Sequence, residues 1–219
     1  MSDFQRARRA MLDSQVRTIG VTDRRLLAAM DRVPREDFVP ESRRAIAYID
    51  DIQPLDGQAR GGRFLPPPGI FARLVQLAEI APGDSVLDVG AGSGYSTAVL
   101  AYMAAESVGL EADADLAATA GRNLARLGLA NACIVAGTTA DLAGRAFDAI
   151  VVEGAMEREP TEFFDLLKPG GRLVVLLRQR GVGIATIYMR TEAGIAARSE
   201  FNATLPGLEP PAPVEEFIF

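Results

Sequence analysis

The residues that most constrain the fold of this chain run from Val86 to Tyr95, with the sequence VLDVGAGSGY. An apolar run opens into three alternate glycines and then into a helical pattern that starts at Ser96. A buried parallel strand consists of a short apolar run, and glycines at its end allow positive φ angles and a close approach of the backbone to a ligand. We therefore predict a strand, a tight turn and a helix over 86–101. The turn either binds a ligand or serves only as a connection.

The glycine spacing argues against a dinucleotide cofactor. The dinucleotide fingerprint is G-x-G-x-x-G, and Tyr95 stands here where its last glycine would be. The stretch resembles instead the first motif of class I S-adenosylmethionine-dependent methyltransferases, in which an acidic residue, here Asp88, ends the strand. This resemblance implies S-adenosylmethionine as the cofactor, with a carboxylate placed favourably near its cationic end. The predicted cofactor-binding residues of the turn are Asp88, Gly90, Ala91, Gly92, Ser93 and Gly94.

A second carboxylate follows the next apolar run of the chain. Glu111 lies 21 positions after Gly90, close to the offset of about 20 at which an acidic side chain accepts hydrogen bonds from ribose hydroxyls. Asp113 is better placed to cap the helix that follows, because an aspartate at that point accepts from the first free N–H groups. We therefore predict that Glu111 binds the ribose and that Asp113 is an N-cap.

Composition excludes several kinds of site. The 219 residues include no histidine and one cysteine, which removes the usual general base, the usual serine and cysteine triads and nearly every zinc site. We predict no metal, and we expect Cys133 to be a small buried residue of a strand. The formal net charge of −6 argues against a nucleic-acid partner, since such proteins carry basic patches.

The hydropathy pattern gives an expectation about location. The chain has no apolar run of about 18 residues, the minimum expected for a membrane-spanning helix. Its first residues carry charges with no apolar stretch after them, so we expect no signal peptide. We therefore predict a cytoplasmic protein without a membrane partner, and we make no prediction of its oligomeric state.

The N-terminal third carries a more specific resemblance. Its segments MLDSQVR at 11–17, GVTD at 20–23 and VPREDFVP at 33–40 are similar, in order and spacing, to those of protein-L-isoaspartate O-methyltransferases. The similarity resumes at the glycine turn and at LKPGGRLV, residues 167–174, and covers residues 10–178. The resemblance implies methylation of isoaspartyl residues in damaged proteins or peptides, which is a protein-repair activity.

The substrate loop departs from the pattern of that family. Its members carry G-x-G-Q-T-I-S-x-P, whose threonine and serine hydroxyls are associated with the substrate carboxylate, and an ungapped alignment puts Phe64 and Pro66 at those positions. Matching Gly57-Gln58 instead supplies no Thr-x-Ser either. Without those donors the desolvation of a carboxylate is uncompensated, so we predict weak or absent activity on ordinary isoaspartyl peptides. Arg60 or Arg63 can compensate by a bidentate grip on the carboxylate, which makes Arg63 a catalytic candidate.

Two further strand ends carry candidate residues. Many methyltransferases hold the adenine with an aspartate after the third strand, where this chain has Thr138, whose hydroxyl can make a weaker contact. At the end of the fourth strand, 147–155, the isoaspartyl enzymes have small residues and often threonine, whereas this chain has Glu153. We predict that Glu153 faces the cofactor, as a catalytic base or as a ligand for a cationic group; the alternative is a solvated strand end.

The order of elements predicts the fold. Strands and helices alternate over 84–178, and two strand-like runs joined by a hairpin signal follow. This order is typical of an α/β, Rossmann-like class I methyltransferase fold, with a mostly parallel sheet, a C-terminal antiparallel hairpin and an N-terminal helical extension. We expect residues 1–80 to form that extension and the substrate loop, which can act as a lid, packed on a cofactor-binding domain of residues 81–219. The cofactor should lie across the strand ends at the switch point beside the first strand.

The function predicted on these grounds is S-adenosylmethionine-dependent methyl transfer to a carboxylate oxygen of an isoaspartyl protein or peptide. An ionised carboxylate needs little acid–base help, and placing it in line with the methyl group supplies much of the acceleration. Two alternatives stay open. One is a protein that keeps the fold and the cofactor but has lost this chemistry; the other is a methyltransferase that acts on a small molecule or a nucleic acid.

Overall fold

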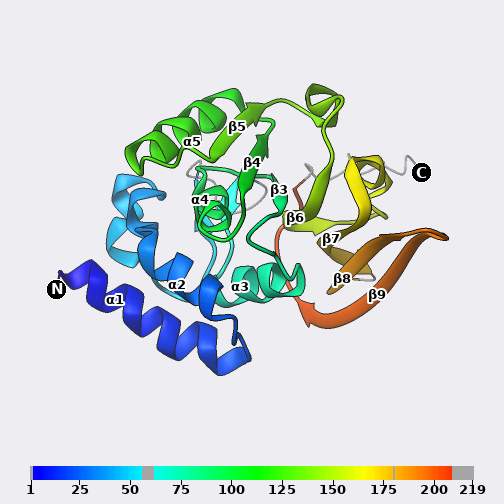
Figure 1. Cartoon of the computed structure of the whole chain (residues 1–219). Coiled ribbons are helices and arrows are strands. Elements are labelled where there is room, and N and C mark those ends of the chain that lie inside the picture. The colour runs from blue at the N-terminus through cyan, green and yellow to red at the C-terminus, as the bar shows by residue number, and fades with distance from the viewer. Residues whose placement is uncertain (1, 56–61, 180, 209–219) are drawn as a thin grey trace, which may run out of the picture.

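The structure, a computed structural model, describes residues 2–55, 62–179 and 181–208. Its centre is a seven-stranded sheet in the order β5-β4-β3-β6-β7-β8-β9 (Figure 1), parallel from β5 to β7 and antiparallel from β7 to β9. The predicted α/β fold with a C-terminal antiparallel hairpin is confirmed. The strands are β3 (Ser85–Val89), β4 (Glu106–Glu111), β5 (Ala132–Ala136), β6 (Phe147–Met156), β7 (Leu167–Gln179), β8 (Val182–Thr191) and β9 (Gly194–Ala203).

Helices dominate the N-terminal part of the chain and connect the parallel strands. The α-helices are α1 (Asp3–Met11), α2 (Arg24–Arg32), α3 (Pro68–Leu77), α4 (Tyr95–Ala101) and α5 (Ala114–Arg126). Short helical turns are η1 (Leu12–Val16), η2 (Arg17–Ile19), η3 (Arg35–Asp37), η4 (Glu41–Ile46), η5 (Thr139–Leu142) and η6 (Thr161–Leu166). A separate antiparallel pair, β1 (Gln53–Pro54) and β2 (Phe64–Leu65), lies between η4 and α3.

Aspartate caps fix where two of these helices begin. The Asp23 carboxylate accepts hydrogen bonds from the backbone N–H groups two and three positions on, at 2.8 and 3.2 Å, and starts α2. Asp113 makes the same two contacts at 2.9 Å and starts α5, as predicted. Such caps satisfy N–H groups that have no partner inside the helix.

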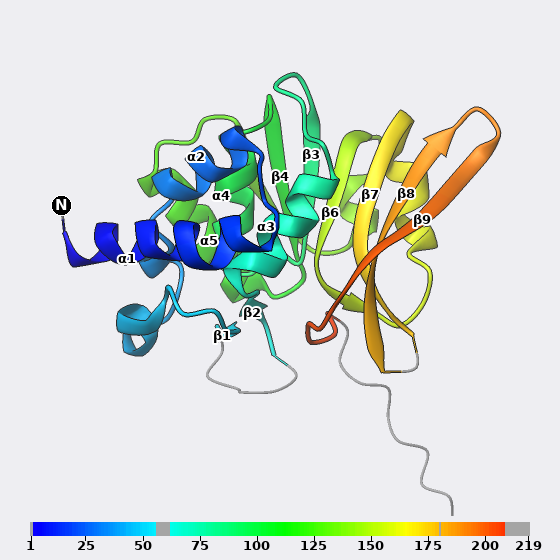
Figure 2. The same ribbon diagram turned by 90° about the horizontal axis from the view of Figure 1, so that it is seen from below.

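The sheet has a different cover on each face. Side chains alternate along each strand. Val86 and Val151 therefore belong to the core cluster that includes residues of α1 to α5, whereas Leu87 and Ile150 belong to the cluster that includes residues of η5 and η6. Figure 2 shows the helices gathered beside β3 and β4, while the β8–β9 hairpin extends away from them. The thinner cover on the η5 and η6 side leaves room for a cavity at the strand ends.

One burial prediction is wrong. Cys133 is exposed, because β5 is the edge strand of the sheet and lacks a neighbour on its outer side. Among the described residues, the helices are too short or too polar to cross a membrane.

Candidate functional site

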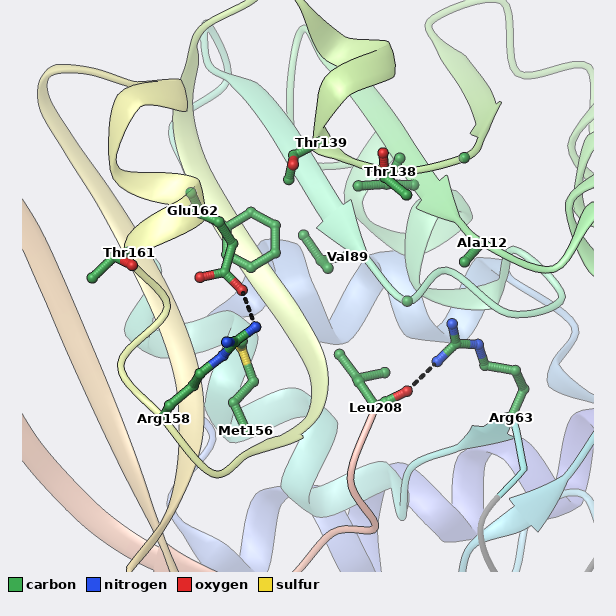
Figure 3. A pocket seen from close by; sticks show the side chains of 14 residues that line it. Arg63, Val89, Ala112, Thr138, Thr139, Met156, Arg158, Thr161, Glu162 and Leu208 are labelled. Atoms are coloured by element: carbon green, nitrogen blue, oxygen red, sulfur yellow. Dashed lines mark hydrogen bonds and ion pairs between the residues drawn. The ribbon is translucent and has the colours of Figure 1, made fainter. Parts of the chain in front are cut away.

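A cavity of about 580 Å³ opens at the carboxyl ends of the parallel strands. The chain crosses from β3 to β4 to β5 on one side of β3 and places β6 on the other side, so β3 and β6 border the switch point at which open α/β sheets bind ligands. The volume lies within the range of about 300–1,000 Å³ that is usual for ligand sites. The lining residues at the ends of β3, β4 and β5 are Val89, Gly90, Leu110, Ala112, Gly137, Thr138 and Thr139. Figure 3 labels Val89, Ala112, Thr138 and Thr139.

The glycine turn follows β3 and contributes Gly90 to the cavity lining. The predicted strand, turn and helix are present: β3 ends at Val89, and α4 begins at Tyr95, one residue before the predicted start. Gly90, Gly92 and Gly94 have φ angles of 81°, 55° and 89°, which side chains rarely tolerate. A Cβ atom at Gly90 would also lie 2.5 Å from Leu208 Cδ2. The turn therefore requires glycines for their positive φ angles, and Gly90 is also required because Leu208 packs directly against it.

Glu111 is fully buried beside this turn. Its Oε2 accepts from the Gly92 N–H at 2.8 Å, and its Oε1 accepts from the Asp113 N–H and from Arg63 Nε, both at 2.9 Å. A carboxylate has about four acceptor positions, and three of them are filled. The structure thus places Glu111 at the predicted strand end. Arg63 donates to its Oε1, an oxygen that the two ribose hydroxyl groups would also need as an acceptor.

Arg63 reaches Glu111 from the β1–β2 pair. The Leu55 N–H donates to the Arg63 carbonyl at 2.9 Å, which places Arg63 directly before β2. Its Nη1 donates to the Leu208 carbonyl oxygen at 2.9 Å (Figure 3). The Arg63 guanidinium therefore links Glu111 to the segment around Leu208, a contact that the sequence did not predict. Arg60 and Gly57-Gln58, also considered for this loop, lie outside the described residues.

The two positions where the family has hydroxyl groups face the protein interior. Phe64 and Pro66 are buried, and neither is among the residues that line the cavity. The Pro66 carbonyl accepts from Nη2 of the fully buried Arg35 at 2.7 Å. Neither side chain can donate a hydrogen bond to a substrate, as the sequence indicates.

Asp88 is buried on the helix side of the sheet, beneath the turn. Its Oδ2 accepts from the hydroxyl groups of Ser96, at 2.7 Å, and Thr97. Its Oδ1 has no hydrogen-bond partner among the described residues. Burial raises the pKa of Asp88 to about 6, although the two hydroxyl groups oppose this shift. The site therefore holds a carboxyl group with an unused acceptor.

Glu153 lies where β6 departs from its regular register against β7, between Val151 and Ala155. Such bulges re-aim side chains and are frequent beside active sites. The residue is only 3% exposed, and both carboxyl oxygens lack a partner in the part of the chain that the structure describes. Burial, and then the neighbouring Asp88, raise the pKa of Glu153 well above its usual value. The alternative of a solvated strand end is therefore wrong.

The remaining predicted cofactor-binding residues, Thr138, Ala91 and Ser93, have different surroundings. Thr138 lines the cavity and starts η5, where its N–H donates to Asp141 Oδ2 at 2.9 Å. Ala91 is buried. The Ser93 hydroxyl donates to the Phe38 carbonyl at 2.6 Å, so this side chain ties the turn to the N-terminal region.

Sequence reasoning missed part of the cavity lining. Met156, Phe163 and Leu208 belong to this part. Met156 ends β6, so the rule that ligands bind at the carboxyl ends of strands could have found it. Leu208 lies in a proline- and glycine-containing stretch without periodicity, and no local signal indicates its place.

Sequence comparison gives a consistent result. Residues 6–202 match the family model described as Protein-L-isoaspartate(D-aspartate) O-methyltransferase. A protein-L-isoaspartate O-methyltransferase of Koribacter versatilis is 38% identical over 204 residues, which cover 92% of this chain and 90% of that protein. One of Methylorubrum populi is 42% identical over 176 residues, 80% of each.

Two solved structures share the fold. A protein-L-isoaspartate O-methyltransferase matches with a TM-score of 0.76 and 22% identity over 91% of this chain and 65% of its own. A putative protein-L-isoaspartate O-methyltransferase from Plasmodium falciparum, in complex with S-adenosyl-L-homocysteine, matches with a TM-score of 0.76 and 23% identity over 95% of this chain and 99% of its own.

Proposed function

Because this chain belongs to the protein-L-isoaspartate O-methyltransferase family, we propose that it transfers a methyl group from S-adenosylmethionine to a carboxylate oxygen of an isoaspartyl protein or peptide. One observation carries this proposal. The buried Glu111 carboxylate accepts from the glycine turn, and its chain neighbours Leu110 and Ala112 and its partner Arg63 line a cavity large enough for a cofactor. This is the arrangement that a ribose needs at the switch point of such a sheet.

The residues present fit S-adenosylmethionine. Glu111 would hold the ribose hydroxyls, the turn from Gly90 to Gly94 would accept the close approach of the ligand, and Thr138 would contact the adenine. The buried carboxyl groups of Asp88 and Glu153 have unpartnered oxygens, and an opposite charge nearby favours their ionised form. They would thus favour a cationic group of the ligand at the strand ends, although neither lines the cavity. When bound, the cofactor supplies an electrophilic methyl group.

The chain itself contributes binding and orientation. An acceptor carboxylate is already ionised at neutral pH, so no general base is required and positioning is the main task. Arg63 is the candidate for holding this acceptor. If ribose hydroxyls take its place on Glu111 Oε1, the guanidinium becomes available for a charge-assisted, bidentate contact with the acceptor.

The alternative is a relative that binds the cofactor but no longer methylates isoaspartyl residues. The buried Phe64 and Pro66 favour it, because loss of one or two charge-assisted hydrogen bonds costs roughly 1.5–3 kcal/mol each. Weak or absent activity on ordinary isoaspartyl peptides therefore stays a prediction. The division at residue 80 and the cytoplasmic location also stay predictions from the sequence.

Calorimetric titration with S-adenosylhomocysteine tests the cofactor site. We expect binding by the unmodified chain and a loss of about 1–3 kcal/mol in Glu111→Ala, because polar hydroxyls would be left unpaired. Asp113→Ala is the matched control, since it removes only a helix cap two residues away and should leave the affinity unchanged. Absence of heat with the unmodified chain at high concentration would contradict the proposal.

A further inference from the structure

The chain's own residues 206–208 lie along the end of β6. The Ala155 N–H donates to the Pro206 carbonyl at 2.9 Å, and the Leu208 N–H donates to the Ala155 carbonyl at 3.1 Å, forming a parallel bridge between Ala155 and Gly207. These contacts use backbone groups alone. Any extended peptide can make them, as in the strand-addition mode of peptide recognition.

The side chain and the carbonyl of Leu208 fill two further positions. The side chain lies over Gly90 and Gly154, where added Cβ atoms would lie 2.5 and 2.7 Å from it, and it lines the cavity. The carbonyl accepts from Arg63 (Figure 3). A residue in this register therefore directs its side chain toward the cavity and presents its carbonyl to a guanidinium. We call the surface formed by Gly90, Gly154, Ala155 and Arg63 the β6-end groove.

We propose that the β6-end groove binds an extended segment of the substrate protein, with the acceptor residue in the place of Leu208, and that residues 206–208 occupy it as an internal competitor. The acceptor assignment rests on the proposed function; the peptide-binding groove itself does not. A methyl acceptor must reach the cofactor cavity, and in this groove the Leu208 position is the one whose side chain lines it.

Residues 206–208 are held weakly enough for an external peptide to replace them in the β6-end groove. Pro206, Gly207 and Leu208 are each only half-buried, and two backbone hydrogen bonds and the Arg63 contact attach them. A tethered competitor acts at an effective concentration that is typically millimolar. The unmodified chain should therefore bind an external peptide weakly, and weakening the internal segment should expose the groove.

The test uses a fluorescein-labelled peptide of sequence NATLPGLE, which corresponds to residues 202–209. Fluorescence polarisation measures its binding to the full chain and to Leu208→Pro, which lacks the N–H that donates to Ala155. We expect binding to Leu208→Pro to be about tenfold tighter. Thr204→Ala, an exposed position of the same segment, should behave as the unmodified chain, and a peptide with proline at the leucine of the Gly-Leu step should not bind.

Two further variants decide between explanations. Adding Arg63→Ala to Leu208→Pro should abolish the gain, because the peptide carbonyl loses its donor. If Leu208→Pro does not fold by circular dichroism, Leu208→Ala replaces it, with a smaller gain expected. Folded variants that bind the peptide no better than the unmodified chain, or that bind the proline-containing peptide equally well, would overturn the proposal. Titration with S-adenosylhomocysteine in parallel distinguishes failure of the β6-end groove from failure of the proposed function. Peptide binding without cofactor binding would contradict the proposed function alone.

Discussion

Replacing Arg63 by methionine should tighten cofactor binding while it destabilises the protein. Three donors fill three of the four acceptor positions of Glu111, and a ribose diol brings two more. One donor must leave. The Gly92 and Asp113 donors are backbone groups, whereas Arg63 is a side chain that is 23% exposed, so Arg63 is the donor that leaves.

The size of the expected change in affinity follows from the Arg63–Glu111 contact, which the ribose must break. A hydrogen bond to a charged group contributes about 1.5–3 kcal/mol, so Arg63→Met should strengthen S-adenosylhomocysteine binding by roughly 10- to 150-fold. The same variant should lose about 1.5–3 kcal/mol of unfolding free energy, because a buried carboxylate loses a partner. Calorimetry and urea unfolding measure the two effects.

Arg145→Met is the control for the change in net charge. Arg145 pairs with Glu106 at 2.6 Å, and neither residue lines the cavity, so this variant should leave the affinity for the cofactor unchanged. Unchanged or weaker binding by a folded Arg63→Met protein would refute the reasoning. In that case Arg63 would be a ligand of the cofactor rather than a competitor for Glu111.

Two other predictions concern the turn and the buried carboxyl pair. Gly92→Ala should lower the unfolding free energy by about 1–2 kcal/mol, the cost of a left-handed non-glycine residue. It should also weaken S-adenosylhomocysteine binding, because an added Cβ would lie 2.8 Å from Leu55 Cδ1 and would shift the turn whose N–H donates to Glu111. Equal affinity and equal urea midpoints would contradict this. Burial raises the pKa of Asp88 to about 6 and the pKa of Glu153 well above its usual value. Above about pH 4 the folded state therefore binds more protons than the unfolded chain, and the contribution of these two groups to stability falls as the pH rises toward their folded-state pKa values. We therefore compare the unfolding free energies of Glu153→Gln and the unmodified chain at two pH values. The difference should shift in favour of Glu153→Gln between pH 5 and pH 8. A difference in urea unfolding that does not change with pH would count against the raised pKa of Glu153.

The sequence predicts those parts of the molecule that local rules govern. The glycine turn and the period of apolar residues determine the β3–α4 unit, and the regular β3–α4–β4 connection brings Glu111 to the turn because parallel strands end at one edge. The cap at Asp113 follows from side-chain chemistry alone. Each of these features depends on contacts between residues close in sequence or on a regular repeat.

The remaining features depend on contacts between distant segments. Arg63 meets Glu111 only because β1 and β2 pair, and Leu208 lies on Gly90 because an irregular stretch follows the end of β6. Glu153 is buried by a change of register against β7 that no pattern in β6 indicates. Cys133 is exposed because β5 became an edge strand. Such features are set by tertiary packing, which periodicity does not encode.

Methyl transfer itself is the most direct test of the function. The chain is incubated with S-adenosylmethionine carrying a labelled methyl group, together with an isoaspartyl peptide or the same peptide with ordinary aspartate, and the label that mild base releases as methanol is counted. We predict base-labile label on the isoaspartyl peptide only, formed more slowly than by a relative that has the threonine and serine hydroxyls. A base-stable product, or equal label on the peptide with ordinary aspartate, would contradict methylation of isoaspartyl carboxylates. No transfer by a chain that binds S-adenosylhomocysteine would support the alternative that has lost this chemistry.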